Sequence, residues 1–191
     1  NGLSEGIIWD YKNNSTADWL LDHYGIDSNL TPDLVDNFSN QGATNLKSSN
    51  ETGLNVGVPI TYRAGDQPNN ALALNVFDNG EVAASGGTSG VIYSITNNLE
   101  SNEPSRINHF AHVNYNNNNK SIGKLLCING AGIQYRWLRN HSIHESYEKM
   151  NEVAANIPVG SEGVSVIPFG NGSERMLDNK NIGTHICNIN L

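Results

Sequence analysis

Three short glycine-containing turns, each at the end of an apolar segment, constrain the fold of this chain more than any other feature. They lie at residues 65–68, 86–90 and 130–132 of a sequence of 191 residues. The first separates an expected strand at 58–64 from an expected helix at 69–74. A tight turn that leads from a strand into a helix is where α/β enzymes place active groups. The sequence therefore predicts an α/β fold with its chemistry at these turns.

The hydrophobic pattern also predicts the elements around the turns. Residues 81–85 and 91–95 flank the second turn and predict a β-hairpin. The other expected elements are strands at 107–113, 125–128 and 164–169, helices at 133–138 and 143–157, a short capped helix that follows 15–18 and ends at Gly25, and a helical turn that opens at Pro32. Near residues 77–80 the sequence pattern changes from a helical segment to a β-hairpin with a glycine-rich turn. This change predicts one domain over 1–78 and a second over 79–191.

Composition limits the class of protein. Hydrophobic residues make up 37% and charged residues 16% of the chain, which is typical of a soluble globular protein. The formal net charge of −8 argues against a general nucleic-acid binder. No apolar run reaches the length of a membrane span, so no membrane partner is expected. The chain starts without a signal peptide or an initiator methionine and ends within an apolar-polar alternation, so we expect an internal piece of a longer protein.

Cysteine, histidine and tryptophan are interpreted as structural residues. The two cysteines, Cys127 and Cys187, allow one disulfide at most, and the apolar neighbours of Cys127 predict a buried free thiol, which favours the cytoplasm. Two pairs among the six histidines have i, i+3 spacing but lack the further ligands of a metal site. The three tryptophans, Trp9, Trp19 and Trp137, are expected in the core.

Asp66 is the sharpest catalytic candidate. It follows the expected strand and stands next to an expected helix start, where a carboxylate stays ionised and can accept a proton from a substrate hydroxyl. The alternative is a plain turn or capping aspartate. Gln67 is a candidate for hydrogen bonding to a polyol, and alternatively an ordinary turn residue.

The two later turns are candidate phosphate sites. Closely spaced glycines around Thr88 and Ser89 let backbone N–H groups form an anion nest, although no P-loop lysine is present. The alternative is a flexible hairpin turn. The segment 130–132 opens a helix, and a helix N-terminus attracts phosphate; the alternative there is close packing of a loop.

Taken together, these segments resemble the FGGY family of carbohydrate kinases. Residues 64–72, Ala-Gly-Asp-Gln-Pro-Asn-Asn-Ala-Leu, resemble the family's segment with the catalytic aspartate. Residues 81–90, ending in Gly-Gly-Thr-Ser-Gly, resemble its second phosphate loop, and residues 129–138 are similar to its next nucleotide-contacting segment. Residues 166–175, with a glycine-containing turn and a Glu-Arg pair, resemble a fourth segment. The resemblance covers almost the whole chain in order and spacing.

The resemblance implies a partial actin-like ATPase (ribonuclease H-like) fold: the end of a sugar-binding domain and the first half of an ATP-binding domain. It implies that Asp66 is catalytic and contacts the sugar together with Gln67. It also implies a bound Mg²⁺, whose ligands the sequence does not identify.

The nucleotide residues follow from the same resemblance. It implies that Thr88 and Ser89 hold the ATP phosphates and that Gly130 and Gln134 line the nucleotide site. The chain alone is expected to be inactive and to self-associate, with a homodimer as one form.

The substrate implied is a ketopentose. Residues 105–114 resemble xylulose kinases, which implies phosphorylation of D-xylulose to D-xylulose 5-phosphate. Two alternatives stay open: another FGGY kinase acting on glycerol or a different ketose, and a non-catalytic binding domain.

Overall fold

Residues 1–143 and 146–190 are described by the computed structural model, and their contacts divide the chain into two units. Unit 1 consists of Asn1–Ala83, Tyr93–Ser101 and His109–Lys124, and unit 2 of Ala84–Ile92, Asn102–Asn108 and Leu125–Leu191. This division concerns compactness within the chain, so the domain boundary expected near residue 79 stays a prediction.

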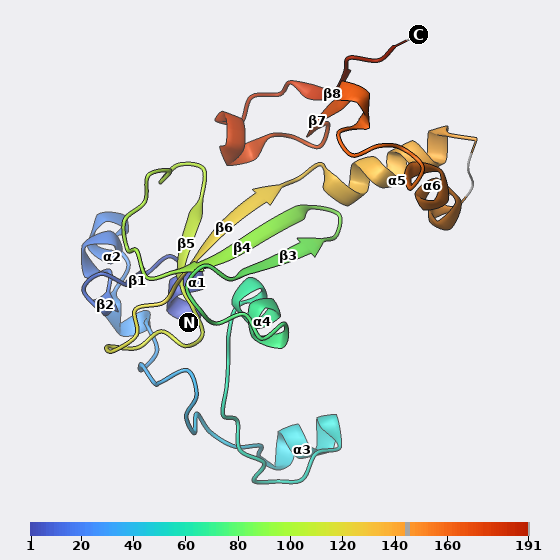
Figure 1. Ribbon diagram of the computed structural model, residues 1–191. Helices are drawn as coiled ribbons and strands as arrows, with labels where there is room; N and C mark the ends of the chain where they lie inside the picture. Colours follow the sequence, from blue (N-terminus) through green and yellow to red (C-terminus); the bar gives the residue numbers. More distant parts are fainter. Residues whose placement is uncertain (144–145, 191) are drawn as a thin grey trace. The chain divides into compact units, whose positions relative to one another are not determined.

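Helices and strands follow one another in small groups along the chain (Figure 1). The α-helices are α1 (Gly2–Glu5), α2 (Asp18–Tyr24), α3 (Leu46–Thr52), α4 (Asp66–Ala73), α5 (Ala131–His141) and α6 (Tyr147–Ala154), with short 3₁₀ helices at Ser28–Leu30, Ser161–Gly163 and Glu174–Leu177. The strands are β1 (Trp9–Asp10), β2 (Ser15–Thr16), β3 (Val82–Gly86), β4 (Gly90–Thr96), β5 (Asn108–Ala111), β6 (Ile122–Ile128), β7 (Ser165–Phe169) and β8 (Gly183–Cys187).

The main sheet has four strands in the order β3-β4-β6-β5 (Figure 1). Strands β3 and β4 are neighbours joined by residues 87–89, so the expected hairpin with its glycine-rich turn is confirmed. Two smaller antiparallel pairs complete the strands: β1 with β2, and β7 with β8, in which Val166 stands opposite Ile186. The strands expected at 107–113, 125–128 and 164–169 are present as β5, β6 and β7.

Helix boundaries follow local signals where these are strong. Gly25 ends α2 in the left-handed conformation, as expected, because glycine adopts positive φ without a steric penalty. The N-terminus of α2 differs from the prediction: Ala17 is the N-cap without a side-chain bond, and residues 15–16 form β2 instead. Helix α3 was not predicted, although Asn45 and Ser48 form a capping box there.

Two expected elements are wrong. Residues 58–64 make only isolated bridges, Ala43 with Pro59 and Phe38 with Tyr62, instead of a strand. Proline has no N–H to donate, and the partner segment near residue 40 is itself irregular, so no regular ladder forms. No helical turn follows Pro32; a 3₁₀ turn at Ser28–Leu30 precedes it, where the Asp27 carboxylate accepts a hydrogen bond from the N–H of Asn29.

Helices α5 and α6 correspond to the two expected late helices. Helix α6 begins at Tyr147, where the hydroxyl of Ser146 accepts a hydrogen bond from the N–H of Lys149, and ends before residue 157. The expected helix at 143–157 also included residues 144–145, which lie outside the described residues.

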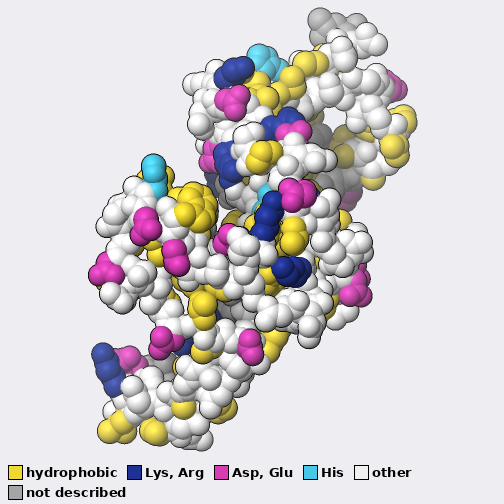
Figure 2. All heavy atoms as spheres, turned by 90° about the vertical axis from the view of Figure 1, so that its left-hand side faces the viewer, with side chains coloured by type: hydrophobic (Ala, Val, Ile, Leu, Met, Phe, Trp, Pro, Cys, Tyr) yellow, Lys and Arg dark blue, Asp and Glu magenta, His cyan; other side chains and the backbone are white. Residues whose placement is uncertain are grey.

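Several large apolar side chains are exposed rather than buried. Trp19 is 68% exposed and Trp137 51% exposed, so their expected core positions are wrong. A helical pattern shows which residues share a face but not whether another element covers that face. Figure 2 shows hydrophobic side chains at the surface among charged ones on the face that it draws. Cys127 and Cys187 are free and half-buried, so Cys127 is less buried than expected.

None of the helices within residues 1–143 and 146–190 is both long and apolar enough to cross a membrane.

The core of unit 1 contains a hydrogen-bonded histidine. His112 is fully buried, and its Nε2 lies 3.1 Å from the Val76 carbonyl oxygen. That oxygen only accepts, so Nε2 carries the proton and Nδ1 accepts from the hydroxyl of Tyr93 at 3.1 Å. Burial lowers the pKa of His112 to about 4, against a smaller opposing effect of the Val76 hydrogen bond. The imidazole is therefore a neutral structural link between three segments of unit 1.

Acidification is expected to destabilise unit 1 through His112. Its pKa is lower in the folded state than in the unfolded chain, so protonation favours unfolding and stability falls as the pH drops below the unfolded value. The free energy of unfolding is expected to fall by about 2 kcal/mol between pH 7 and pH 5 from this residue alone. Urea unfolding followed by tryptophan fluorescence measures it. His112→Gln should remove this part of the pH dependence, whereas His23→Gln, at an exposed position, should retain it.

Candidate functional site

The first candidate residue, Asp66, stands at the start of helix α4 in unit 1. Gly65 is the N-cap residue in extended conformation, and the helix begins at Asp66 itself. The side chain is exposed, and its Oδ1 accepts a hydrogen bond from the N–H of Gln67 at 2.6 Å. The positive end of the helix dipole favours a carboxylate in this position. The structure thus presents Asp66 as an accessible anion next to Gln67.

The turn before Asp66 is held by the side chain of Asn1. Asn1 Oδ1 accepts from the N–H of Gly65 at 2.9 Å, and Asn1 Nδ2 donates to the carbonyl of Ala111 at 2.7 Å. Ala111 N–H in turn donates to Ser4 Oγ at 2.7 Å. Helix α1 and strand β5 therefore fix the turn through side chains that the sequence analysis did not single out. Nothing in the local sequence marks Asn1, because its partners are far away along the chain.

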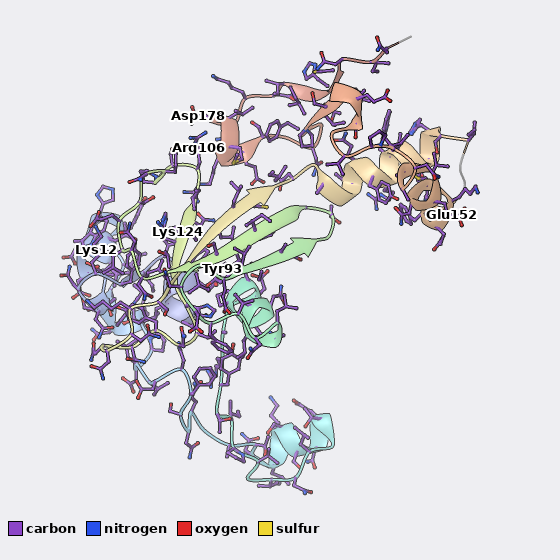
Figure 3. All side chains as sticks on the ribbon, viewed as in Figure 1. Lys12, Tyr93, Arg106, Lys124, Glu152 and Asp178 are labelled. Carbon is purple, nitrogen blue, oxygen red and sulfur yellow. The ribbon has the colours of Figure 1, made fainter. Side chains whose placement is uncertain are left out.

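A second carboxyl group lies behind the same turn. A Cβ atom added to Gly65 would stand 2.2 Å from Cδ of Glu5, so the Glu5 carboxyl packs directly on this glycine. Glu5 Oε1 is buried and has no hydrogen-bond partner. Burial raises the pKa of Glu5, and the nearby charge of Asp66 raises it further. Tyr93, labelled in Figure 3, lies on β4, and the charge of Glu5 contributes to the raised pKa of its hydroxyl after burial.

In unit 2, the glycine-rich hairpin loop packs on the start of helix α5. The N–H groups of Gly132 and Ile133 donate to the carbonyls of Gly87 and Thr88 at 3.0 and 3.1 Å. A Cβ on Gly132 would lie 2.0 Å from the Gly87 oxygen, so only glycine fits. These two N–H groups at the helix start are therefore already bonded. Close packing, the plainer interpretation of the segment 130–132, describes these contacts.

The hydroxyl side chains of the loop differ in environment. Thr88 is exposed, while Ser89 is half-buried and its Oγ donates to Asn129 Oδ1 at 3.4 Å. Thr88 therefore has a free path to a ligand, whereas Ser89 also ties the loop to the residue after β6.

A pocket of about 420 Å³ lies beside helix α5 in unit 2. Its walls are Gly130, Ile133, Gln134, Trp137, Gly170, Asn171, Thr184 and Ile186. Gly130 and Gln134, both predicted to line the nucleotide site, are thus brought together, whereas Thr88 and Ser89 are not among its walls. Gln134 Oε1 is buried without a partner, an acceptor that a bound amino or hydroxyl group would satisfy. A Cβ on Gly130 would stand 1.4 Å from the carbonyl oxygen of Pro168, so no side chain fits at this position of the wall.

A metal site is not evident in either unit. No group of three or more His, Cys, Asp and Glu side chains that could hold an ion occurs among the residues that the structure describes. The candidate residues fall into two sets: Asp66 and Gln67 in unit 1, and Thr88, Ser89, Gly130 and Gln134 in unit 2.

Solved structures similar to this chain include xylulose, glycerol and gluconate kinases. The xylulose kinase from Rhodospirillum rubrum matches with a TM-score of 0.78 at 20% identity, over 98% of this chain and 37% of that one. The glycerol kinase from Plasmodium falciparum with ADP matches with 0.79 at 18%, over 96% and 36%. The gluconate kinase from Lactobacillus acidophilus matches with 0.77 at 19%, over 96% and 37%. The expected actin-like ATPase fold of the FGGY kinases is thereby confirmed.

Curated protein sequences similar to this chain include xylulose kinases. The xylulose kinase of Haemophilus influenzae is 28% identical over 120 residues, which cover 63% of this chain and 23% of that protein. The xylulose kinase of Staphylococcus xylosus is 23% identical over 164 residues, 85% of this chain and 33% of that protein. No protein-family model matches the chain. The chain is a homologue of the xylulose kinases, which are carbohydrate kinases, and it spans a third or less of the length of these two relatives.

Gly132→Ala is expected to destabilise unit 2. Alanine favours a helix by about 1 kcal/mol over glycine, but its methyl group would collide with the Gly87 carbonyl, and such overpacking costs about 1–3 kcal/mol. Gly86→Ala is the matched control, because nothing lies within 4 Å of its added Cβ. Thermal unfolding of both variants measures the difference. A Gly132→Ala protein as stable as Gly86→Ala would show that the loop does not pack on α5 in this way.

Proposed function

We propose that this chain contributes the catalytic aspartate and part of the nucleotide site of an ATP-dependent sugar kinase. The observation that carries the proposal is Asp66, an exposed carboxylate at the start of α4 on a turn held by Asn1. Such a carboxylate suits a general base, because it is accessible and fixed in position. The xylulose kinase homologues support the reaction class.

The residues of unit 2 fit a nucleotide. The pocket beside α5 has apolar walls from Ile133, Trp137 and Ile186 and one unmatched acceptor, Gln134 Oε1. An apolar slot with few polar groups is typical of a site for a flat base. We propose that Gly130 and Gln134 line the nucleotide site.

The phosphate end of the nucleotide is assigned to the hairpin loop. Thr88 has an exposed hydroxyl, and Ser89 stands next to it on the same loop. We propose that both contact the ATP phosphates. Mg²⁺ would neutralise charge on the transferred phosphoryl group, and its ligands are not assigned to residues of this chain.

The proposed reaction is an in-line phosphoryl transfer. Asp66 accepts the proton of a primary hydroxyl while that oxygen forms a bond to the γ-phosphorus. The bond from this phosphorus to the β–γ bridging oxygen breaks, and ADP leaves. Gln67, adjacent to the base, hydrogen-bonds the sugar and keeps the hydroxyl in line.

We propose D-xylulose as the acceptor, with D-xylulose 5-phosphate as the product. Support comes from the curated relatives, which are named xylulose kinases. Neighbours named gluconate and glycerol kinases support the class of polyhydroxy acceptors but favour no single one. Another FGGY acceptor, glycerol or a different ketose, is therefore the second candidate. Comparing turnover of D-xylulose, glycerol and gluconate by the full-length protein distinguishes them.

Asp66→Asn and Thr88→Val are expected to separate in the kinetics of the full-length protein. Asparagine keeps the size of the side chain but cannot take the proton, so kcat should fall by about 10²–10⁴ with little change in the ATP KM. Thr88→Val should mainly raise the ATP KM, by the equivalent of about 1–3 kcal/mol. A coupled ADP-release assay measures both.

The control for these variants is Asp22→Asn, an exposed aspartate on α2. It should behave as wild type. If Asp66→Asn keeps more than about a tenth of the wild-type kcat, Asp66 is a turn residue and not the base.

A further inference from the structure

Glu5 is a half-buried residue with one buried carboxyl oxygen, and the proposed reaction does not use it. Its side chain lies against Gly65, the residue before Asp66, with Cδ, Cγ and Oε1 at 2.2, 2.3 and 2.4 Å from an added Cβ. The backbone φ of Gly65 is −70°, which any residue adopts. Glycine is required here by the presence of Glu5 and not by the turn itself.

The environment of this carboxyl group is unusual. Glu5 Oε1 is buried without a hydrogen-bond partner, and the hydroxyl of Tyr62 is likewise buried and unmatched. Buried polar atoms are nearly always paired, so an unmatched carboxyl oxygen is costly for packing alone. A residue that only filled space behind Gly65 would be better served by an apolar side chain.

We propose that Glu5 is a positioning residue for the kinase reaction: its carboxylate fixes the Gly65 turn and its negative charge promotes proton transfer to Asp66. This inference rests on the proposed function. When Asp66 takes a proton, one of two neighbouring negative charges disappears, so an ionised Glu5 favours that step. Glu5 is half-buried behind the turn and packs on Gly65, the residue before the proposed base.

The groups that face Glu5 define its expected titration. Burial is the largest cause of the raised pKa of Glu5, and the charge of Asp66 raises it further. The hydroxyl of Tyr93 is also within electrostatic reach. Since the pKa of Glu5 is raised above its ordinary 4.5, its charge is lost at a higher pH than that of an ordinary glutamate, and its effect on turnover should be lost with it.

The test compares Glu5→Gln with wild type in the full-length protein across a pH series. Glutamine keeps the shape but not the charge, so kcat with D-xylulose should fall by about three- to tenfold at neutral and alkaline pH. The ATP KM should not change. The ratio of the two kcat values should approach one as the pH falls through the pKa of Glu5. Glu5→Asp, which keeps the charge, should lie closer to wild type and retain the pH-dependent step. Glu51→Gln, an exposed charge loss on α3, is the matched control and should equal wild type.

Each outcome of this experiment either supports or contradicts the role inferred for Glu5. Equal kcat values for Glu5→Gln and wild type, or a ratio that is the same at every pH, would overturn the inference while leaving the kinase function in place. Wild-type protein without turnover on any sugar would overturn both. If thermal unfolding shows that Glu5→Gln does not fold, the Glu5→Asp profile decides: loss of the pH-dependent step in a folded Glu5→Asp protein contradicts the proposal.

Discussion

Two backbone hydrogen bonds organise the part of the chain assigned to the nucleotide. The carbonyls of Gly87 and Thr88 accept from the N–H groups of Gly132 and Ile133 in the first turn of helix α5. This contact fixes the hairpin loop and the helix as one piece, because a helix start left without acceptors would be unfavourable when covered. The contact therefore holds the loop that carries Thr88 against the helix that carries Gln134. The absence of a side chain at Gly132 makes the approach possible.

In unit 1, a side chain instead of the backbone makes the hydrogen bonds that hold the candidate turn in place. There a side-chain amide, that of Asn1, joins the N–H of Gly65 to the carbonyl of Ala111 and so ties the Asp66 turn to strand β5. Amide groups can donate and accept at once, which suits a bridge between two backbone segments. The neutral, buried His112 extends this pattern, because it links Val76 to Tyr93. Unit 1 therefore combines fixed polar bridges with buried apolar side chains, among them Ala71 on the helix that starts at Asp66.

Local signals made some of this predictable from the sequence. The hairpin around residues 86–90, strand β7 and the end of α2 at Gly25 follow from turn chemistry and periodicity within a few residues. The segment of Asp66 was identified by its resemblance to a family. The strand at 58–64 failed because its formation depends on a distant partner segment. Asn1 and Glu5 could not be singled out, since their partners near Gly65 lie about sixty residues away. Trp137 shows that periodicity does not tell whether a helical face is covered.

Two glycines in the lining of the pocket beside α5, Gly130 and Gly170, limit how substitutions can change its shape. At Gly130 an added Cβ would lie 1.4 Å from the carbonyl oxygen of Pro168, which leaves no room for any side chain, whereas at Gly170 it would lie 2.5 Å from the side-chain hydroxyl of Thr184. Substitution at Gly130 therefore requires movement of the backbone, and substitution at Gly170 requires the Thr184 side chain to move. The shape of the pocket can therefore be changed more readily at its other lining side chains, such as Gln134, Trp137 and Ile186. The backbone thus fixes the shape of the pocket at Gly130, and side chains set it elsewhere.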